Sequence, residues 1–269
     1  MIYHYSKRFL SKLLGCFGIG LVRFNELTVL KDRKLYSEKA EFDFEFIKVL
    51  EQNERDTFLK WREFSKAQLS QDILVVLKLN QQRGGFFVEI GGADGVYCSN
   101  THMLEKELAW EGVIVEPARS WHKELRKNRQ CAIDLSAIGG ETIERIRFFE
   151  AESPNLSTLS TLHNFDGGGK SRKKFKEYDV RQLSLRDLLI NHNAPKLIDY
   201  LSIDVEGNEY GILENFNFSE YNIKIITCEH NFNSNKSKID DLLAANGFKQ
   251  IYEEISSFDG WYINTRLIS

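Results

Sequence analysis

Five polar residues able to do chemistry follow two apolar runs in the second half of the chain. Asp204 and Glu206 come after the first run, and Glu229, His230 and Asn231 come after the second. Carboxylates, and an imidazole that titrates near neutrality, can hold a polar substrate and accept a proton from it. We therefore predict that these segments form a catalytic site, with His230 as the general base.

The same segments also permit a metal-dependent mechanism. Asp204, Glu229 and Asn231 all offer oxygen ligands, which hard divalent cations such as Mg²⁺ prefer. His230 stands between the acid and the amide and provides a base that needs no metal. We favour the metal-free base, and the magnesium site is the alternative.

A second group of candidate residues surrounds a glycine-rich turn. The apolar run 86–90 leads directly into Gly91-Gly92-Ala93-Asp94-Gly95, and Ser99-Asn100-Thr101 can then begin a helix. Another apolar run, 112–115, ends in Glu116-Pro117. A strand, a glycine turn and a helix form the first half of a nucleotide-binding α/β unit, in which an acid at the end of the second strand binds the ribose hydroxyl groups.

The charges near this turn indicate which nucleotide cofactor it accepts. Glu89 precedes the turn and Asp94 lies in it. Two carboxylates would repel the pyrophosphate of a dinucleotide, which binds to bare backbone N–H groups at a helix N-terminus. They suit the ammonium and sulfonium groups of S-adenosylmethionine. The spacing of the glycines also differs from G-x-G-x-x-G, so NAD is disfavoured.

These segments resemble the FkbM-type family of S-adenosylmethionine-dependent methyltransferases. The resemblance is carried by Glu-Ile-Gly-Gly-Ala-Asp-Gly, Ser-Asn-Thr and Ile-Val-Glu-Pro between residues 86 and 117, and by Ile-Asp-Val-Glu-Gly-Asn-Glu at 203–209. It extends through Cys-Glu-His-Asn at 228–231 and covers roughly residues 65 to 266. It implies the class I methyltransferase fold, a Rossmann-like α/β fold with a seven-stranded sheet and helices on both faces. It also implies O-methylation of a sugar or polyketide hydroxyl group.

The resemblance assigns these residues to two sites. In this fold the loop after the third strand, here expected at 131–135, borders the adenine ring, so Asp134 and Ser136 join the cofactor site. The residues expected to bind the cofactor are Glu89, Gly91, Gly92, Asp94, Gly95, Asn100, Glu116, Pro117, Asp134 and Ser136. The residues expected at the transfer site are Asp204, Glu206, Glu229 and His230. N- or C-methylation, or a module that binds the cofactor without turnover, are the alternatives.

The elements that must position these residues divide the chain into two parts. Residues 65–269 are expected to form the S-adenosylmethionine-binding domain, and residues 1–64 an N-terminal helical extension. Residues 1–23 contain four basic residues and no acid, with leucines at helical spacing. Such a helix can lie on an anionic membrane surface, pack on the main domain, or pair subunits into a homo-oligomer.

The composition limits the classes of function. The 269 residues include 36 basic and 39 acidic side chains, a formal net charge of −3, which argues against a general nucleic-acid binder. No apolar run reaches the roughly 20 residues of a membrane-spanning helix, and the four cysteines are widely spaced. We therefore expect a cytoplasmic protein that can touch the inner face of the membrane through residues 1–23. The acceptor is expected to be a small molecule or glycan. Five of the seven residues at 170–176 are basic, so this segment can bind a phosphate on a sugar nucleotide or a lipid-linked glycan, and a solvated loop is the alternative.

Overall fold

A computed structural model describes residues 39–151, 158–159, 175–205 and 207–268 of the chain, which divides into two compact units, 1–45 and 46–269. In the first unit the described residues, 39–45, are helical. In the second unit the ring of Phe46 lies 5.4 Å from that of Tyr252 and 5.3 Å from that of Trp261. The predicted domain boundary after residue 64 stays a prediction. The amphipathic segment 1–23, most of the basic segment 170–176, and Glu206 lie outside the described residues.

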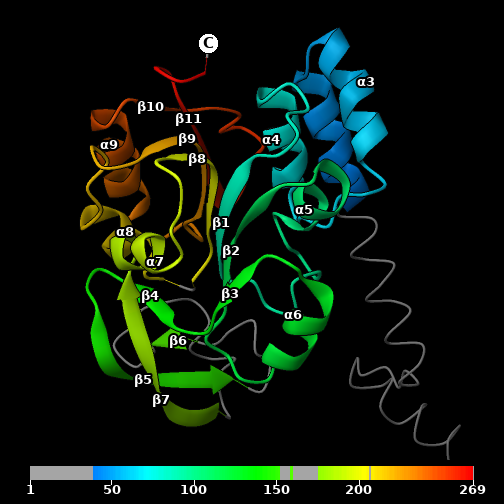
Figure 1. The fold of residues 1–269 in the computed structure, drawn as a ribbon. Coiled ribbons are helices and arrows are strands. Elements are labelled where there is room, and N and C mark those ends of the chain that lie inside the picture. The colour runs from blue at the N-terminus through cyan, green and yellow to red at the C-terminus, as the bar shows by residue number, and fades with distance from the viewer. Residues whose placement is uncertain (1–38, 152–157, 160–174, 206, 269) are drawn as a thin grey trace, which may run out of the picture. The chain divides into compact units, whose positions relative to one another are not determined.

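A seven-stranded sheet forms the centre of the second unit (Figure 1). Its strands lie in the order β10-β11-β9-β8-β1-β2-β3, and β11 is antiparallel to both of its neighbours whereas the other pairs are parallel. The strands are β1 (Phe86–Ile90), β2 (Glu111–Val115), β3 (Ala132–Asp134), β8 (Leu197–Ile203), β9 (Asn222–Glu229), β10 (Phe248–Gln250) and β11 (Asp259–Asn264). With helices on both faces, this sheet confirms the predicted class I methyltransferase fold.

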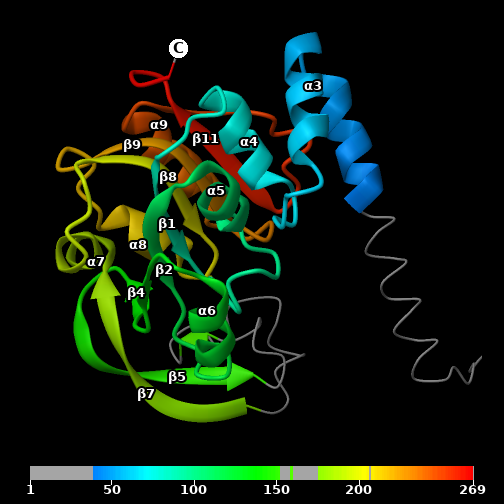
Figure 2. The same cartoon turned by 45° about the vertical axis from the view of Figure 1, so that its right-hand side comes forward.

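The helices cover the two faces of the sheet as two groups (Figures 1 and 2). One face carries α4 (Gln71–Lys78), α5 (His102–Leu108) and α6 (His122–Asn128), and the other carries α7 (Leu185–Asn191), α8 (Glu209–Glu214) and α9 (Lys236–Ala245). Helix α3 (Gln52–Trp61) packs beside α4. None of the helices in the described part of the chain has the length and hydrophobicity needed to cross a bilayer.

Alternation along β1 explains why this strand is buried on both faces. Val88 and Ile90 belong to the core under α7, α8 and α9, together with Leu188 and Ile212. Since successive side chains of a strand point to opposite faces, Phe87 and Glu89 face the other group of helices. Glu89 therefore enters the interior of the protein, where a carboxylate requires partners.

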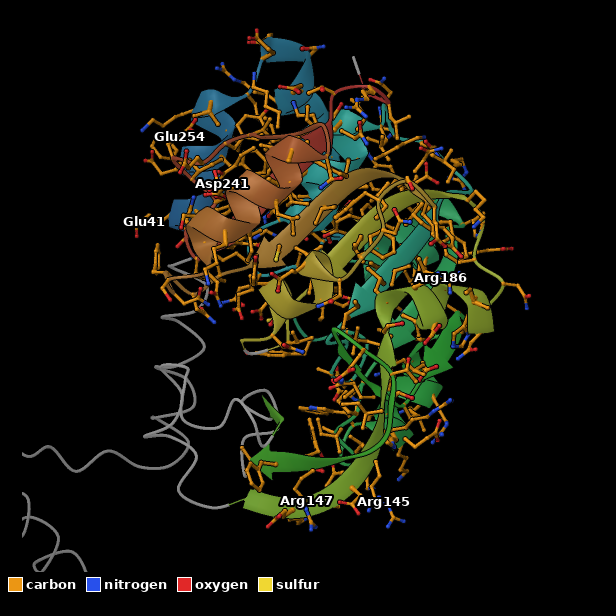
Figure 3. The ribbon with its side chains drawn as sticks, turned by 90° about the vertical axis from the view of Figure 1, so that its left-hand side faces the viewer. Glu41, Arg145, Arg147, Arg186, Asp241 and Glu254 are labelled. Atoms are coloured by element: carbon orange, nitrogen blue, oxygen red, sulfur yellow. The ribbon has the colours of Figure 1, made fainter. Side chains whose placement is uncertain are left out.

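A second, four-stranded sheet, in the order β4-β7-β5-β6, was not predicted from the sequence. Its strands are β4 (Ala137–Gly139), β5 (Ile143–Ala151), β6 (Thr158–Leu159) and β7 (Phe175–Ser184). The side chains of Arg145 and Arg147 point outward from β5 (Figure 3), and both form ion pairs with Asp179 on β7 at 3.4 Å. Because only a few positions of β5 are buried and charged residues occupy exposed ones, the sequence of this strand lacks a clear apolar pattern.

Candidate active site

The glycine turn after β1 lies between the ends of two neighbouring strands. Because β2 and β8 both run parallel to β1, the carboxyl ends of the three strands meet at one edge, where ligands bind in folds of this kind. Gly91 has a φ of +93°, and a Cβ at this position would lie 1.9 Å from the carbonyl oxygen of Asp204. Only glycine permits this conformation and this contact. The turn therefore brings the end of β1 directly against Asp204.

Glu116 contacts the same turn from the side of β2. Its Oε2 accepts the N–H of Ala93 at 2.8 Å, and its Oε1 accepts the N–H of Ala118 at 2.7 Å. Burial raises the pKa of this carboxyl group to about 7, although the two hydrogen bonds act in the opposite direction. Each oxygen keeps a second lone pair, so Glu116 can still accept a hydrogen bond from a ligand hydroxyl group.

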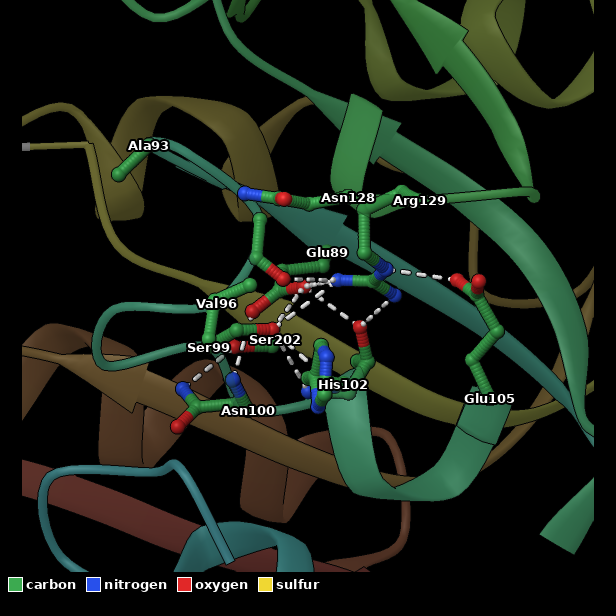
Figure 4. A network of polar contacts seen from close by, with 12 residues as sticks. Glu89, Ala93, Val96, Ser99, Asn100, His102, Glu105, Asn128, Arg129 and Ser202 are labelled. Atoms are coloured by element: carbon green, nitrogen blue, oxygen red, sulfur yellow. Dashed lines mark hydrogen bonds and ion pairs between the residues drawn. The ribbon is translucent and has the colours of Figure 1, made fainter. Parts of the chain in front are cut away.

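Glu89, which the sequence assigned to the cofactor, lies at the centre of a buried polar network (Figure 4). Its carboxylate forms an ion pair with Arg129 at 3.2 Å. Arg129 also binds Glu105 at 2.6 Å, and its charge and hydrogen bonds lower the pKa of Glu105 to about 2 although burial acts to raise it. The other partners of Glu89 precede α5: the hydroxyl groups of Ser99 and Thr101 and the N–H of Asn100. We call Glu89, Glu105 and Arg129 the paired cluster.

Two other acids expected to bind the cofactor stabilise turns of the chain. The Oδ1 of Asp94 accepts the N–H groups of Val96 at 2.9 Å and Tyr97 at 2.7 Å. Asp134 binds the Nε2 of His192 at 2.8 Å, and burial opposes the hydrogen bonds that lower the pKa of this carboxyl group. Its Oδ1 also accepts the N–H of Ser136 at 2.8 Å, and the place of these two residues beside the adenine stays a prediction.

The remaining expected cofactor residues lie in tight packing around the turn. A Cβ at Gly92 would lie 2.3 Å from the side chain of Ile114, and one at Gly95 would lie 2.5 Å from that of Arg129. Pro117 follows Glu116, and its carbonyl accepts the hydroxyl group of Tyr178 at 3.5 Å. These contacts explain the residue types by packing, and their role in cofactor binding stays a prediction.

A small pocket opens at the other side of Asp204. Glu229 ends β9, and Asp259 begins β11 directly opposite it. Because β11 is antiparallel, its first residue lies at the edge where the parallel strands end. The free space has a volume of about 10 Å³, close to the room of a single water molecule. We call this space the acidic pocket, and the polar residues that line it include Gln71, Asn100, Asp204, Thr227, Glu229 and Asp259.

The carboxyl groups of the acidic pocket bind protons more tightly than usual. Burial raises the pKa of Asp204, although a hydrogen bond with Glu229 acts to lower it. Burial also raises the pKa of Asp259 to about 7, against the bonds that its Oδ2 accepts from Gln71 Nε2 at 2.8 Å and Trp261 Nε1 at 3.1 Å. The sequence did not indicate Asp259 or Gln71, since 188 residues separate them.

His230 is not among the described residues that line the acidic pocket. It is buried against its own loop, where its Nδ1 accepts the N–H of Phe232 at 3.1 Å and the two rings lie 5.5 Å apart. Burial lowers the pKa of the imidazole, which favours its neutral form. Asn231 is exposed. The structure thus brings Asp204 and Glu229 together in a pocket that His230 does not line, and the role of His230 as the base stays a prediction.

The tentative magnesium site also stays a prediction. Among the described residues, no three His, Cys, Asp or Glu side chains are grouped so that they could hold a metal ion.

Comparison with known proteins identifies the family. The sequence model of the FkbM methyltransferase domain matches residues 89–250. The chain belongs to the FkbM methyltransferase family. The matched region of this FkbM protein begins at Glu89 and includes the glycine turn, Glu116, Asp204 and Glu229, whereas Asp259 lies beyond it.

Three solved methyltransferase structures are similar to this FkbM protein. The FkbM methyltransferase of Methylobacillus flagellatus KT has 12% sequence identity and a TM-score of 0.44, over 96% of this chain and 70% of the other. Precorrin-6y C5,15-methyltransferase of Geobacter metallireducens GS-15 has 11% identity and a TM-score of 0.35, over 71% and 85%. The ribosomal protein L11 methylase of Lactobacillus delbrueckii subsp. bulgaricus has 11% identity and a TM-score of 0.36, over 73% and 79%. A search of curated proteins gave no match.

Proposed function

We propose that this methyltransferase uses S-adenosylmethionine to methylate a hydroxyl group of a sugar. Membership of the family supports methyl transfer, and the sugar hydroxyl rests on the family resemblance seen in the sequence. The assignment of S-adenosylmethionine as the cofactor is supported mainly by the position of two acids around the glycine turn. Glu116 lies on its β2 side and Asp204 on its β8 side, both at the carboxyl edge of the sheet.

The residues at this edge fit S-adenosylmethionine in their chemistry. Glu116 offers buried acceptor oxygens for the ribose hydroxyl groups, and donation from these hydroxyls favours its ionised form. The acidic pocket is lined by no lysine, arginine or histidine among the described residues, so its charge suits a positively charged ligand. When bound, the cofactor supplies a methyl group on a positively charged sulfur.

The acceptor hydroxyl must lose its proton when the methyl group is transferred. We assign this proton to the pair of Asp204 and Glu229. Two carboxyl groups share a hydrogen bond only if one of them holds a proton, and burial raises the pKa of Asp204, so the pair is suited to accept a proton. Its place at the ends of β8 and β9 puts it beside the glycine turn, within the sheet edge that binds the cofactor.

Calorimetric titration with S-adenosylhomocysteine, the product of the cofactor, tests the proposed function. We expect binding to the wild-type protein, and a Glu116→Gln variant to bind about 10-fold or more weakly, the value of one hydrogen bond to a charged group. Glu111→Gln is the matched control, because Glu111 is an exposed acid at the other end of the same strand. NAD should not bind. Binding of NAD alone, or equal affinity of the two variants, would show that the cofactor site is assigned wrongly.

A further inference from the structure

The buried acceptor atoms of the acidic pocket that have no hydrogen-bond donor include two on which a ligand can act. They are the Oδ1 of Asp259 and the Oδ1 of Asn100, in side chains that are 3% and 8% exposed. A buried acceptor without a donor normally costs about 1–3 kcal/mol. Both residues line the acidic pocket, which is therefore one place where a ligand can meet the two acceptors.

Both side chains are held in place by hydrogen bonds of their other polar atom. Asp259 uses its other oxygen to bind Gln71 and Trp261. Asn100 donates from its Nδ2 to the Oγ of Ser202 at 2.9 Å, and Figure 4 shows its oxygen on the side away from the paired cluster. The acceptors are therefore fixed in place before a ligand arrives, as in sites that recognise a particular group.

The charge of the pocket shows what kind of donor is missing. Asp204, Glu229 and Asp259 line it, and no lysine, arginine or histidine does so among the described residues. A neutral donor such as water can fill the hydrogen bonds but leaves the negative charge uncompensated. A cation that also donates hydrogen bonds meets both needs.

The geometry favours an organic cation over a metal ion. The described acids do not form a group that could hold a metal. Among organic cations the volume decides, because the space available is about that of one water molecule. A primary ammonium group has this size, three N–H donors and a positive charge. A guanidinium group is planar and larger, with five donors in a fixed arrangement.

We propose that the acidic pocket binds a primary ammonium group, which donates to the Oδ1 atoms of Asp259 and Asn100 and is neutralised by the surrounding carboxylates. The sequence had placed this role at Glu89 and Asp94. In the structure Arg129 neutralises Glu89, and Asp94 accepts two backbone N–H groups of its own turn. The proposed cation site lies on the same sheet edge, where β8 and β9 end and β11 begins.

Two ligands could supply this ammonium group, the cofactor and the acceptor. The choice between them rests on the proposed function, which names both ligands. The ammonium group belongs either to the amino-acid end of S-adenosylmethionine or to an amino group on the acceptor, which would then be an amino sugar. The binding chemistry is the same in both cases. Pairs of probes that differ in the amino group alone distinguish them.

The decisive variant is Asp259→Asn in the whole chain. The amide oxygen of asparagine can still accept the bonds from Gln71 and Trp261, while its NH₂ group replaces the acceptor that faces the pocket. Asp241→Asn is the control, because it removes the same charge from an exposed position on α9 (Figure 3). Circular dichroism of each variant verifies the fold.

Calorimetry then measures four ligands. They are S-adenosylhomocysteine, its analogue with hydrogen in place of the α-amino group, glucosamine and glucose. If Asp259→Asn weakens S-adenosylhomocysteine 10-fold or more and leaves the deaminated analogue unchanged, the ammonium belongs to the cofactor. If it weakens glucosamine and leaves glucose and S-adenosylhomocysteine unchanged, the ammonium belongs to the acceptor.

The proposal is overturned if both amino ligands keep their affinity within twofold, or if each amino ligand and its partner weaken alike. It is also overturned if neither amino ligand binds the wild-type protein. If Asp259→Asn does not fold, the wild-type comparison decides, because at least one amino ligand must bind 10-fold more tightly than its partner. Failure of the proposed function gives a different result, because S-adenosylhomocysteine then does not bind to the wild-type protein. In that case the comparison of glucosamine with glucose alone tests the pocket.

Discussion

The paired cluster and the acidic pocket both place several acids inside the protein, in neighbouring regions that Asn100 connects. In the paired cluster Arg129 binds Glu89 and Glu105 at once, and the pKa of Glu105 falls to about 2. In the acidic pocket no basic side chain among the described residues lines the space, and the pKa of Asp259 rises to about 7. The same residue type thus stabilises the fold in one region and is left for a ligand in the other.

The largest expected effect separates function from stability in the acidic pocket. Asp204→Asn removes the proposed proton acceptor and should lower turnover about 100- to 10,000-fold. Its amide can still share a hydrogen bond with Glu229, so the midpoint of thermal unfolding should change little. Release of S-adenosylhomocysteine in the presence of a panel of sugars measures the turnover. Full activity of this variant would leave His230 as the base to test.

The paired cluster should respond in the opposite way. Arg129→Met leaves two buried carboxylates without their cation, and the free energy of unfolding should fall by about 3–5 kcal/mol. Urea unfolding at pH 7 measures it. Lys127→Met is the control, since its ion pair with Glu124 is exposed and spans 3.5 Å, a kind of pair that contributes about 0–1 kcal/mol. Similar losses in the two variants would remove the contrast between buried and exposed pairs.

The pH dependence of stability sharpens the comparison. The folded-state pKa of Asp259 is about 7, above the unfolded value near 3.9, so the folded state holds this proton more tightly. Its carboxyl group therefore makes the protein less stable as pH rises from about 4 to 7. Asp259→Asn should reduce that loss by on the order of 3 kcal/mol, at about 1.4 kcal/mol per pKa unit.

Urea unfolding of both proteins at pH 4.5 and pH 8 measures this difference. Glu116 and Glu209, whose pKa values burial also raises to about 7, contribute equally to both proteins and cancel. Glu105 acts with the opposite sign, since its contribution is lost only as pH falls towards 2. An equal fall of stability in both proteins would contradict the burial of an uncompensated acid at position 259.

The smallest effect concerns the backbone between the two regions. Gly91→Ala should destabilise the protein by roughly 1–3 kcal/mol more than Gly84→Ala, the cost of forcing an added atom into a packed site. Both glycines have positive φ, +93° and +65°, but only at Gly91 does a Cβ meet the backbone of Asp204, whereas at Gly84 nothing lies within 4 Å. Thermal unfolding compares the two. Equal shifts would mean that conformational strain, and not the contact with Asp204, explains the glycine.

The sequence predicted the parts of the fold that depend on local composition. The apolar run of β1 coincides with the expected 86–90, and β8 and β9 end at the expected acids. The second sheet escaped prediction, because charges at Arg145 and Arg147 conceal the strand β5. Its pairing with β7 depends on residues more than 20 positions away, which periodicity within one segment does not register.

In the site, sequence reasoning identified acids but not their partners. Glu89 lies before the glycine turn as expected, yet Arg129, 40 residues later in the chain, forms an ion pair with it. Asp259 was missed because an antiparallel strand brings its first residue to the edge where parallel strands end, and no local motif marks it. Whether an acid is structural or free for a ligand is decided by such distant partners.

The antiparallel strand β11 also sets an order of events during synthesis. It lies between β9 and β10, so β10 has no place in the sheet until residues 259–264 have been made and inserted. A nascent chain that has reached residue 258 exposes the edge of β9, a surface that other unfolded chains can pair with. Asp259 is the first residue of β11, so it reaches the acidic pocket only when this strand pairs with β9. Ligand recognition and protection of the sheet edge therefore arise together, in the step that places β11.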